Sequence, residues 1–468
     1  MEPVRLSWFF MVSFAIAAMA PTLMANIADF DEVWRRRAEE AGKRAEFYYH
    51  PNPAAVANEV NKRVLTALNE EGNNTRKLLT VKSPTSYSTK IVKSPSSYST
   101  KTVKYTGPCK AVNPIDKCFR CRPDWNLDRK RLADCALGFG GSATGGKDGE
   151  FYVVTDPSDD NVENPKAGTL RYAVTRKRPL WIIFERSMQI ALKQELIFAN
   201  DKTIDGRGST IEIANGAGFM LQFVHNIIIH NIRIRDTLST KGGMVRDSED
   251  HLGLRTMSDG DGISIYGSSN IWIDHVSMRK CADGLIDAIQ KSTAITISNC
   301  HFTDHNEVML FGGKDGFTED KFMQITLAFN HFGKRLKQRM PRVRYGFVHI
   351  VNNDYTHWES YALGGSSNPI IISQGNRYIA NPNFKVNENP YLVTHRDYAS
   401  EAEWKNWVWR SQGDVFLHGA KFIESGDPTQ ALKLLHDNDD HVQPQDGSMV
   451  TALTEFAGAR SCKKNQPC

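Results

Sequence analysis

Acidic residues recur at a near-constant spacing in the middle of the chain. Asp283 follows Asp259 by 24 residues, and Glu307 follows Asp283 by the same interval. If the chain winds with this period, these carboxylates would lie together, repel one another and raise each other's pKa values. Calcium relieves such repulsion, because it prefers flexible sites made of oxygen ligands. We therefore predict a calcium site formed by Asp259, Asp261, Asp283 and Asp287, with a purely structural role of Asp-Gly pairs in turns as the alternative.

A basic cluster follows the acidic residues along the chain. The next repeat, from Ile295 to Ile325, is 30 residues long. The position that corresponds to Glu307 in that repeat is therefore Lys337, and Arg339 lies two residues further on. The whole cluster comprises Arg335, Lys337, Arg339, Arg342 and Arg344. Guanidinium groups bind carboxylates through paired hydrogen bonds, so the two clusters together suit an acidic ligand.

Histidines and tryptophans offer weaker candidates for chemistry. His301 and His305 are four residues apart, as on a zinc-binding helix, but the residues between them continue a strand pattern. We expect His275 to pack or hydrogen-bond inside a repeat. Trp272 and Trp358 could stack on sugars, and the alternative is that either belongs to the core.

A repeating strand-and-turn pattern must position these residues. Corresponding positions are Ile232, Val276 and Cys300, and later Asn330, Asn353 and Asn376. The first set is separated by 44 and 24 residues, which predicts one additional repeat inside the first gap; the asparagines are 23 apart. The sequence lacks the leucine pattern of leucine-rich repeats and the longer units of a β-propeller. We predict an all-β fold, a right-handed single-stranded parallel β-helix with a short helical N-terminal extension, whose asparagines hydrogen-bond from coil to coil. The alternative is a β-sandwich with coincidental spacing.

The chain divides into five predicted parts. These are a signal peptide at 1–25, a helical extension at 26–80, a low-complexity linker at 81–108, the parallel β-helix domain at 109–460 and a C-terminal tail at 461–468. The apolar run Leu6–Ala20 is too short to span a membrane comfortably, and no later stretch is long and apolar enough. Helical spacing predicts an amphipathic helix over Asp29–His50, capped by Asp31. In the linker, Lys82–Lys90 returns almost unchanged as Lys93–Lys101.

The predicted export of the chain guides the interpretation of its eight cysteines and its charge. Disulfide bonds are expected in an exported protein, and the connectivity stays open. Cys462 and Cys468 could close a terminal loop, and Cys281 and Cys300, which flank one strand and turn, could form another pair. Asn73 begins an Asn-Asn-Thr glycosylation sequon. The formal net charge of +5 suits an acidic polysaccharide better than nucleic acid in an exported monomer, and no membrane partner is expected.

Several long blocks resemble the signature blocks of plant pectate lyases. They are Trp272–His275, Ala282–Ala288, Ser292–Asn299, His305–Leu310, Gln338–Arg342, Asn352–Trp358 and Ser373–Tyr378. The resemblance extends from about Cys118 to Tyr398, with the blocks in the same order. It implies a secreted cell-wall enzyme that cleaves polygalacturonate by calcium-dependent β-elimination.

The resemblance also implies roles for single residues. Arg339 matches the catalytic arginine of the family and Arg344 a substrate-binding arginine, while the four aspartates match calcium ligands. Arg342 is expected to help Arg344 bind substrate carboxylates. The chain departs from the family at Glu307, where many relatives carry lysine, and at Gly313, where a histidine is usual; Lys314 is interpreted as a replacement positive contact. The alternatives are a polygalacturonase on the same fold, which needs two carboxylates, and an inactive pectin-binding wall protein.

Overall fold

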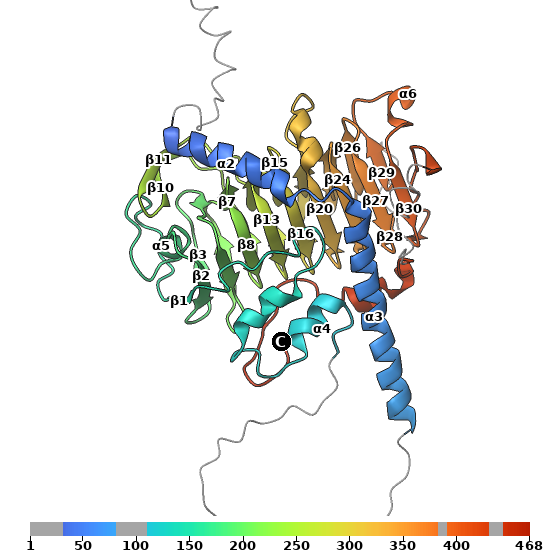
Figure 1. Ribbon diagram of the computed structural model, residues 1–468, viewed down its shortest axis with the longest axis horizontal. Helices are drawn as coiled ribbons and strands as arrows, with labels where there is room; N and C mark the ends of the chain where they lie inside the picture. Colours follow the sequence, from blue (N-terminus) through green and yellow to red (C-terminus); the bar gives the residue numbers. More distant parts are fainter. Residues whose placement is uncertain (1–30, 81–109, 382–390, 430–442) are drawn as a thin grey trace, which may run out of the picture.

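The computed structural model describes residues 31–80, 110–381, 391–429 and 443–468 (Figure 1). The predicted signal peptide, the predicted linker and the side chain of Asn73 lie outside the described part.

Three long parallel sheets wind around one axis, and the chain passes from sheet A to B to C in each coil (Figure 1). Sheet A comprises β1 (Glu150–Val154), β2 (Leu180–Phe184), β5 (Lys202–Asp205), β8 (His225–His230), β13 (Ser269–Asp274), β16 (Thr293–Ser298), β20 (Gln324–Ala328), β24 (Phe347–Val351), β27 (Ile370–Gln374) and β30 (Trp409–Gln412). Sheet B comprises β3 (Met188–Ile190), β6 (Ile211–Ala214), β9 (Arg233–Arg235), β14 (Ser277–Arg279), β17 (His301–Thr303), β21 (His331–Phe332), β25 (Asp354–Thr356), β28 (Arg377–Ile379) and β31 (Val415–Leu417). Sheet C comprises β4 (Leu196–Ile197), β7 (Phe219–Gln222), β12 (Ile263–Tyr266), β15 (Ile286–Ile289), β19 (Met309–Phe311), β23 (Arg342–Arg344), β26 (Leu363–Ser366) and β29 (Thr394–Arg396). The predicted right-handed parallel β-helix is confirmed.

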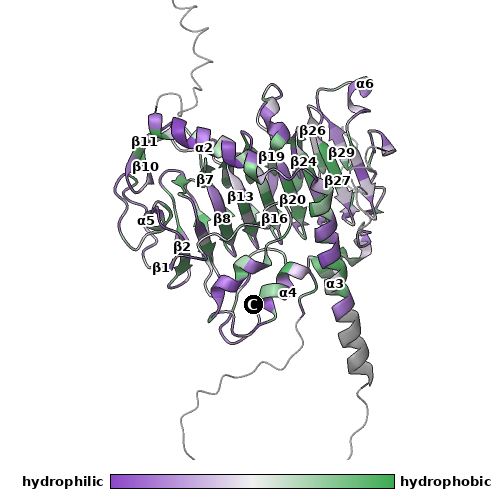
Figure 2. Ribbon diagram, viewed as in Figure 1, coloured by the Kyte–Doolittle hydropathy of each residue, from purple (hydrophilic) through white to green (hydrophobic). Residues whose placement is uncertain are grey.

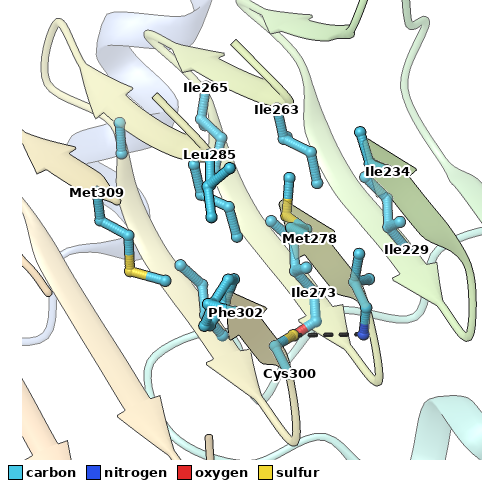
Figure 3. Packing of buried hydrophobic residues seen from close by; sticks show 14 of the residues in the cluster. Ile229, Ile234, Ile263, Ile265, Ile273, Met278, Leu285, Cys300, Phe302 and Met309 are labelled. Atoms are coloured by element: carbon cyan, nitrogen blue, oxygen red, sulfur yellow. Dashed lines mark hydrogen bonds between the residues drawn. The ribbon is translucent and has the colours of Figure 1, made fainter. Parts of the chain in front are cut away.

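Side chains alternate between the interior and the exterior of the coils. On β12, Ile263 and Ile265 are buried, whereas Ser264 and Tyr266 are partly exposed. Aliphatic side chains from all three sheets fill the interior (Figure 3). Chemistry that needs solvent or a ligand is therefore confined to the outward positions and to the loops between strands.

The predicted asparagine column is confirmed. The Asn330 side-chain amide donates to Asn353 Oδ1 over 2.9 Å, and Asn353 donates to Asn376 Oδ1 over 3.0 Å. Two residues after two of these asparagines, Tyr355 and Tyr378 stack with ring centroids 4.7 Å apart. These ladders keep successive coils in register, because each amide satisfies a buried partner in the next coil.

One prediction about the repeats is wrong. Arg233 of β9 lies directly opposite Ser277 of β14, so no coil lies between Ile232 and Val276. The surplus residues instead form an antiparallel hairpin, β10 (Gly243–Ser248) and β11 (His251–Arg255), which is inserted into a single coil. A second small sheet pairs β18 (His305–Glu307) with β22 (Leu336–Gln338).

Two helices precede the coils. Helix α2 (Glu32–Tyr48) begins after Asp31, whose carboxylate caps it by accepting from Val33 and Trp34 N–H, as predicted. α2 crosses successive coils from the β10–β11 hairpin toward β20, and α3 (Pro53–Thr80) follows it (Figure 1). The shorter helical segments are α4 (Pro114–Arg120), α5 (Leu170–Val174), α6 (Glu401–Trp404), α8 (Val450–Leu453) and the 3-10 turns η3 (Arg129–Cys135), η4 (Thr318–Phe322) and η5 (Gly447–Met449).

The cysteines follow the predictions only in part. Cys462 and Cys468 form the suggested terminal disulfide, and Cys118 pairs with Cys135. Cys281 and Cys300 are buried free thiols, so the suggested link between them is wrong. The register of sheet B explains why the two cysteines do not pair. It places Val276, rather than Cys281, beside Cys300, and the Cys300 sulfur accepts the Val276 N–H.

Three of the weaker candidates, Trp272, Trp358 and His275, prove to be structural. Trp272 and Trp358 are both buried in the core, so neither is available to stack on a sugar. His275 is buried between Asp116 Oδ1, 2.7 Å from its Nε2, and the carbonyl of Gly458. His275 is therefore a structural hydrogen-bonding residue as expected, but its partners lie in α4 and the C-terminal segment rather than inside a repeat.

Candidate active site

The outward side chains of sheet C form a row along the axis of the coils. The strand register places Ser264 beside Asp287, Asp287 beside Leu310, and Leu310 beside Arg342. Asp287 and Arg342 are therefore separated by two coils, and neighbouring strands are about 4.8 Å apart. Asp259, Asp261, Asp283 and Arg339 lie in the loops that lead into these strands, Arg344 lies on β23, and Lys314 follows β19.

Two of the aspartates are fixed by hydrogen bonds across coils. Asp261 accepts the Ser264 hydroxyl over 2.6 Å and the Gly284 N–H of the next coil over 2.8 Å. Asp287 accepts the Leu310 N–H, again of the next coil, over 3.0 Å. The repeating backbone thus orients both carboxylates in the same way.

The electrostatics show that the four aspartates influence one another. Burial and then Asp283 raise the pKa of Asp259. Burial, with the charges of Asp283 and Asp259, raises the pKa of Asp261 to about 7. Burial and the charges of Asp261 and Asp283 raise the pKa of Asp287 well above its usual range. None of the ion pairs in the described part of the chain includes one of these four carboxylates. Hydrogen bonds and the charge of Arg339 oppose the rise in pKa only in part, since the pKa values of Asp261 and Asp287 stay raised.

The carboxylates do not form a finished metal cage. Across the described ranges, no three aspartate, glutamate, histidine or cysteine side chains converge as a metal site. The carboxylates can still repel one another at these separations, because Coulomb interactions act over longer distances than coordination bonds. The donor set consists of oxygens and suits a hard cation, but it needs further ligands, such as water or a substrate carboxylate, to complete the coordination.

Gly284 is a site residue that the sequence analysis missed. Its N–H binds Asp261, and a Cβ at this position would lie 2.3 Å from Asp287 Oδ1. Glycine therefore lets the Asp287 carboxylate lie against the backbone between the two coils. The dipeptide Asp283-Gly284 was the available signal, but its glycine was considered only as a turn residue.

Arg339 lies in the loop before β23 and adjoins the acidic group. Its Nη2 is 2.8 Å from Glu307 Oε1, and it also hydrogen-bonds Tyr361. Arg339 lies close enough to Asp287 for its positive charge to oppose the rise in the pKa of that carboxylate. Its buried Nε has no hydrogen-bond partner among the described residues. Glu307 lies opposite Gln338 rather than opposite Lys337 or Arg339, so the predicted column is displaced by one residue.

The other predicted binding residues differ in exposure. The Arg342 side chain is only 4 % exposed, and its Nε lies 2.5 Å from Asp397 Oδ2. Arg344 lies 3.0 Å from Asp315 Oδ1, and burial together with Arg342 lowers its pKa. Lys314 is exposed in the loop after β19. Asp315 and Asp397 hold the arginines in place, and the sequence analysis assigned no role to either.

A cavity of about 190 Å³ lies beneath α2, beside this row rather than on it. Small residues of the helix line one side, and Phe223, Lys291 and Phe317 line the other. None of the acidic site residues or the arginines described above borders it, so we do not assign the reaction centre to this cavity.

A parallel β-helix with adjoining carboxylates and guanidinium groups outside one sheet defines a class of protein suited to extended acidic polysaccharides. The chain belongs to the pectate lyase family. The family model described as pectate lyase matches residues 139–400, and the model described as pectate lyase, N terminus, matches residues 26–79. The family resemblance found in the sequence is thereby confirmed.

Named relatives match over nearly the whole chain. The chain is 54 % identical to "Probable pectate lyase P59" of Solanum lycopersicum over 98 % of both proteins. It is 52 % identical to a pectate lyase of Lilium longiflorum, over 99 % of this chain and 100 % of the relative. The crystal structure of Jun a 1, the major allergen from cedar pollen, superposes with a TM-score of 0.70 at 44 % identity, covering 75 % of this chain and 100 % of Jun a 1.

Proposed function

We propose that the chain cleaves de-esterified pectin, a (1→4)-linked galacturonan, by calcium-dependent β-elimination. The observation that carries this proposal is that mutually repelling carboxylates and Arg339 lie close together along sheet C. Repelling carboxylates suit a divalent cation, and neighbouring arginines suit the carboxylates of an acidic polymer. Relatives named pectate lyase that match almost the full chain support the same reaction.

Calcium is proposed to bind Asp259, Asp261, Asp283 and Asp287. Their all-oxygen chemistry fits this ion, and the charge of Arg339 opposes the raised pKa of Asp287 without reversing it. When bound, the ion would withdraw charge from a galacturonate carboxylate and make the C5 proton more acidic. Gly284 leaves room for one of these carboxylates to take its position.

Arg339 is proposed to remove the C5 proton of the sugar. The electron pair of the broken C–H bond forms a C4–C5 double bond as the C4–O glycosidic bond breaks, and the departing oxygen takes a proton from water. A guanidine must be neutral to accept a proton. Glu307 orients the guanidinium through Nη2, while Arg342, Arg344 and Lys314 are proposed to bind substrate carboxylates.

A single assay tests the proposal. Purified protein is mixed with polygalacturonate in calcium and, separately, in chelator, and the ultraviolet absorbance of the unsaturated product is followed. We expect product only with calcium. New reducing ends without this absorbance would indicate a polygalacturonase, and calcium-dependent binding without any product would indicate an inactive wall protein.

The site of action follows from the substrate. We propose secretion into the cell wall as a monomer, since polygalacturonate lies outside the cell and the chain begins with the features of a signal peptide. The helices of the described part include none with the length and apolar character of a membrane span.

Gly284→Ala is expected to weaken calcium binding about tenfold. The added methyl group would collide with Asp287 Oδ1, 2.3 Å from the ideal Cβ, and displace the carboxylate; a tenfold loss corresponds to about 1.4 kcal/mol. Calcium titration by calorimetry measures the effect. Gly316→Ala is the matched control, because a Cβ there meets nothing within 4 Å; equal affinities in both variants would remove Gly284 from the site.

A further inference from the structure

The outward row of sheet C is covered at one end. The register extends the row backward from Ser264 to Met220 of β7 and then to Ile197 of β4. Ile197 faces outward, because its neighbour Leu196 belongs to the interior cluster, and yet it is 0 % exposed. Ser264 and Asp287, on the next two coils, are partly exposed. Met220, between Ile197 and Ser264, is partly buried. The row is therefore closed at its first strand, β4, and partly covered at β7.

The cover comes from two segments that lie outside the coils. Trp34 of α2 and Val245 of β10 form a buried apolar cluster with Ile197, and Met220 packs against it. Trp34 is fully buried in the first turn of a helix that is otherwise largely hydrophilic (Figure 2). We call these four side chains, Trp34, Val245, Ile197 and Met220, the plug.

Ion pairs hold the plug in place. Arg37 lies 2.9 Å from the buried Asp247 of the hairpin, and its guanidinium is 4.8 Å from the Trp34 ring centroid. Arg255 of the hairpin lies 3.0 Å from Glu195, the residue before β4. Pairs that involve buried partners constrain geometry strongly, because breaking them leaves an uncompensated charge. The plug is thus a fixed wall rather than a loose segment.

We propose that the plug ends the substrate groove beside the calcium site and limits how many sugar units bind on that side; this inference rests on the proposed function. β12, which begins two residues after Asp261, is the first strand beyond the plug. A galacturonan chain that follows the row from Arg342 past Asp287 meets the partly buried Met220 and then the fully covered Ile197. Its next sugars must end there or turn away from the protein, so they gain no contact with sheet C.

The chain-length dependence of the reaction tests this inference. For wild type, kcat/KM on galacturonate oligomers of increasing length should rise and then level off when the groove is filled. Trp34→Ala opens space above Ile197 and Met220, so its kcat/KM should continue to rise, by about tenfold for the longest oligomers, the effect of one further contact of about 1.4 kcal/mol. Its final products should also be longer than those of wild type.

Val60→Ala provides the matched control. Val60 is buried in α3 of the same extension but packs in a separate cluster, away from the plug. The control should keep the wild-type plateau, and a plateau at the same length in Trp34→Ala, or a shift shared by Val60→Ala, would overturn the inference. If Trp34→Ala does not fold, Arg37→Gln loosens the plug and must give the same shift. Absence of unsaturated product from wild type would instead refute the proposed function.

Discussion

Arg339→Lys is expected to lower kcat on polygalacturonate by roughly 10³-fold, within the range by which a positioned acid or base contributes. Lysine keeps the positive charge but lacks the planar set of donors with which Arg339 binds Glu307, at 2.8 Å, and Tyr361. A compact ammonium cannot keep both contacts and face the substrate as well. Initial rates of unsaturated product give kcat, and calorimetry with polygalacturonate in calcium gives affinity, which should change by less than about twofold, or about 0.4 kcal/mol.

Arg335→Lys is the control for this result. Arg335 lies four residues earlier, is exposed and pairs with Asp304, so its replacement should leave kcat near the wild-type value. Near-native turnover of Arg339→Lys with unchanged binding would rule out a specific role for the guanidinium. A loss of turnover and binding together would assign Arg339 to substrate binding alone.

The coil architecture was predictable because interior packing imposes a period on the sequence. Asn330, Asn353 and Asn376 recur every 23 residues because each binds the next one in a buried ladder. Spacing alone could not separate a missing coil from an insertion. The interval from Ile232 to Val276 is close to two periods, but β9 pairs directly with β14 and the surplus forms the β10–β11 hairpin.

The acidic half of the site was predictable for the same reason. Asp261 and Asp287 each accept an N–H from the residue 23 positions later, so the period that builds the coils also stacks the carboxylates. The residues that support the arginines follow no such period. Asp397 contacts Arg342 across 55 positions, and only the folded chain brings the two together.

Trp34 illustrates a different limit. Its helical spacing predicted an apolar face on α2, and its burial agrees with that pattern. The sequence contains nothing that identifies the surface against which this face packs. That surface consists of outward residues of β4 and β7, which resemble ordinary strand residues until the fold shows them covered.

Asp287→Asn is expected to raise the melting temperature above that of wild type at pH 8 in chelator, by roughly 1 °C for a chain of this length if the relieved repulsion is about 1 kcal/mol. The pKa of Asp287 in the folded protein is raised by burial and by Asp261, so the folded protein holds this proton more tightly than the unfolded chain. Wild type therefore loses stability as pH rises above the unfolded pKa of 3.8. Asparagine does not titrate, so the two melting temperatures should converge near pH 4, and thermal melts across this range measure the difference.

Calcium should reverse the order of the two proteins. Binding to the folded state stabilises wild type at pH 8 by mass action, whereas Asp287→Asn lacks a proposed ligand and should gain much less. The gain in wild type should shrink as pH falls through about 7, the pKa of Asp261, because protons compete with calcium for the carboxylates.

Asp304→Asn is the control of opposite sign. Although partial burial opposes it, hydrogen bonds from Thr303 and Arg335 lower the pKa of Asp304, so its charged form stabilises the fold. Its removal should lower the melting temperature at pH 8 with or without calcium. If Asp287→Asn behaved like this control in chelator, Asp287 would be a structural carboxylate with a favourable environment. The repulsion that motivates the calcium site would then have no basis.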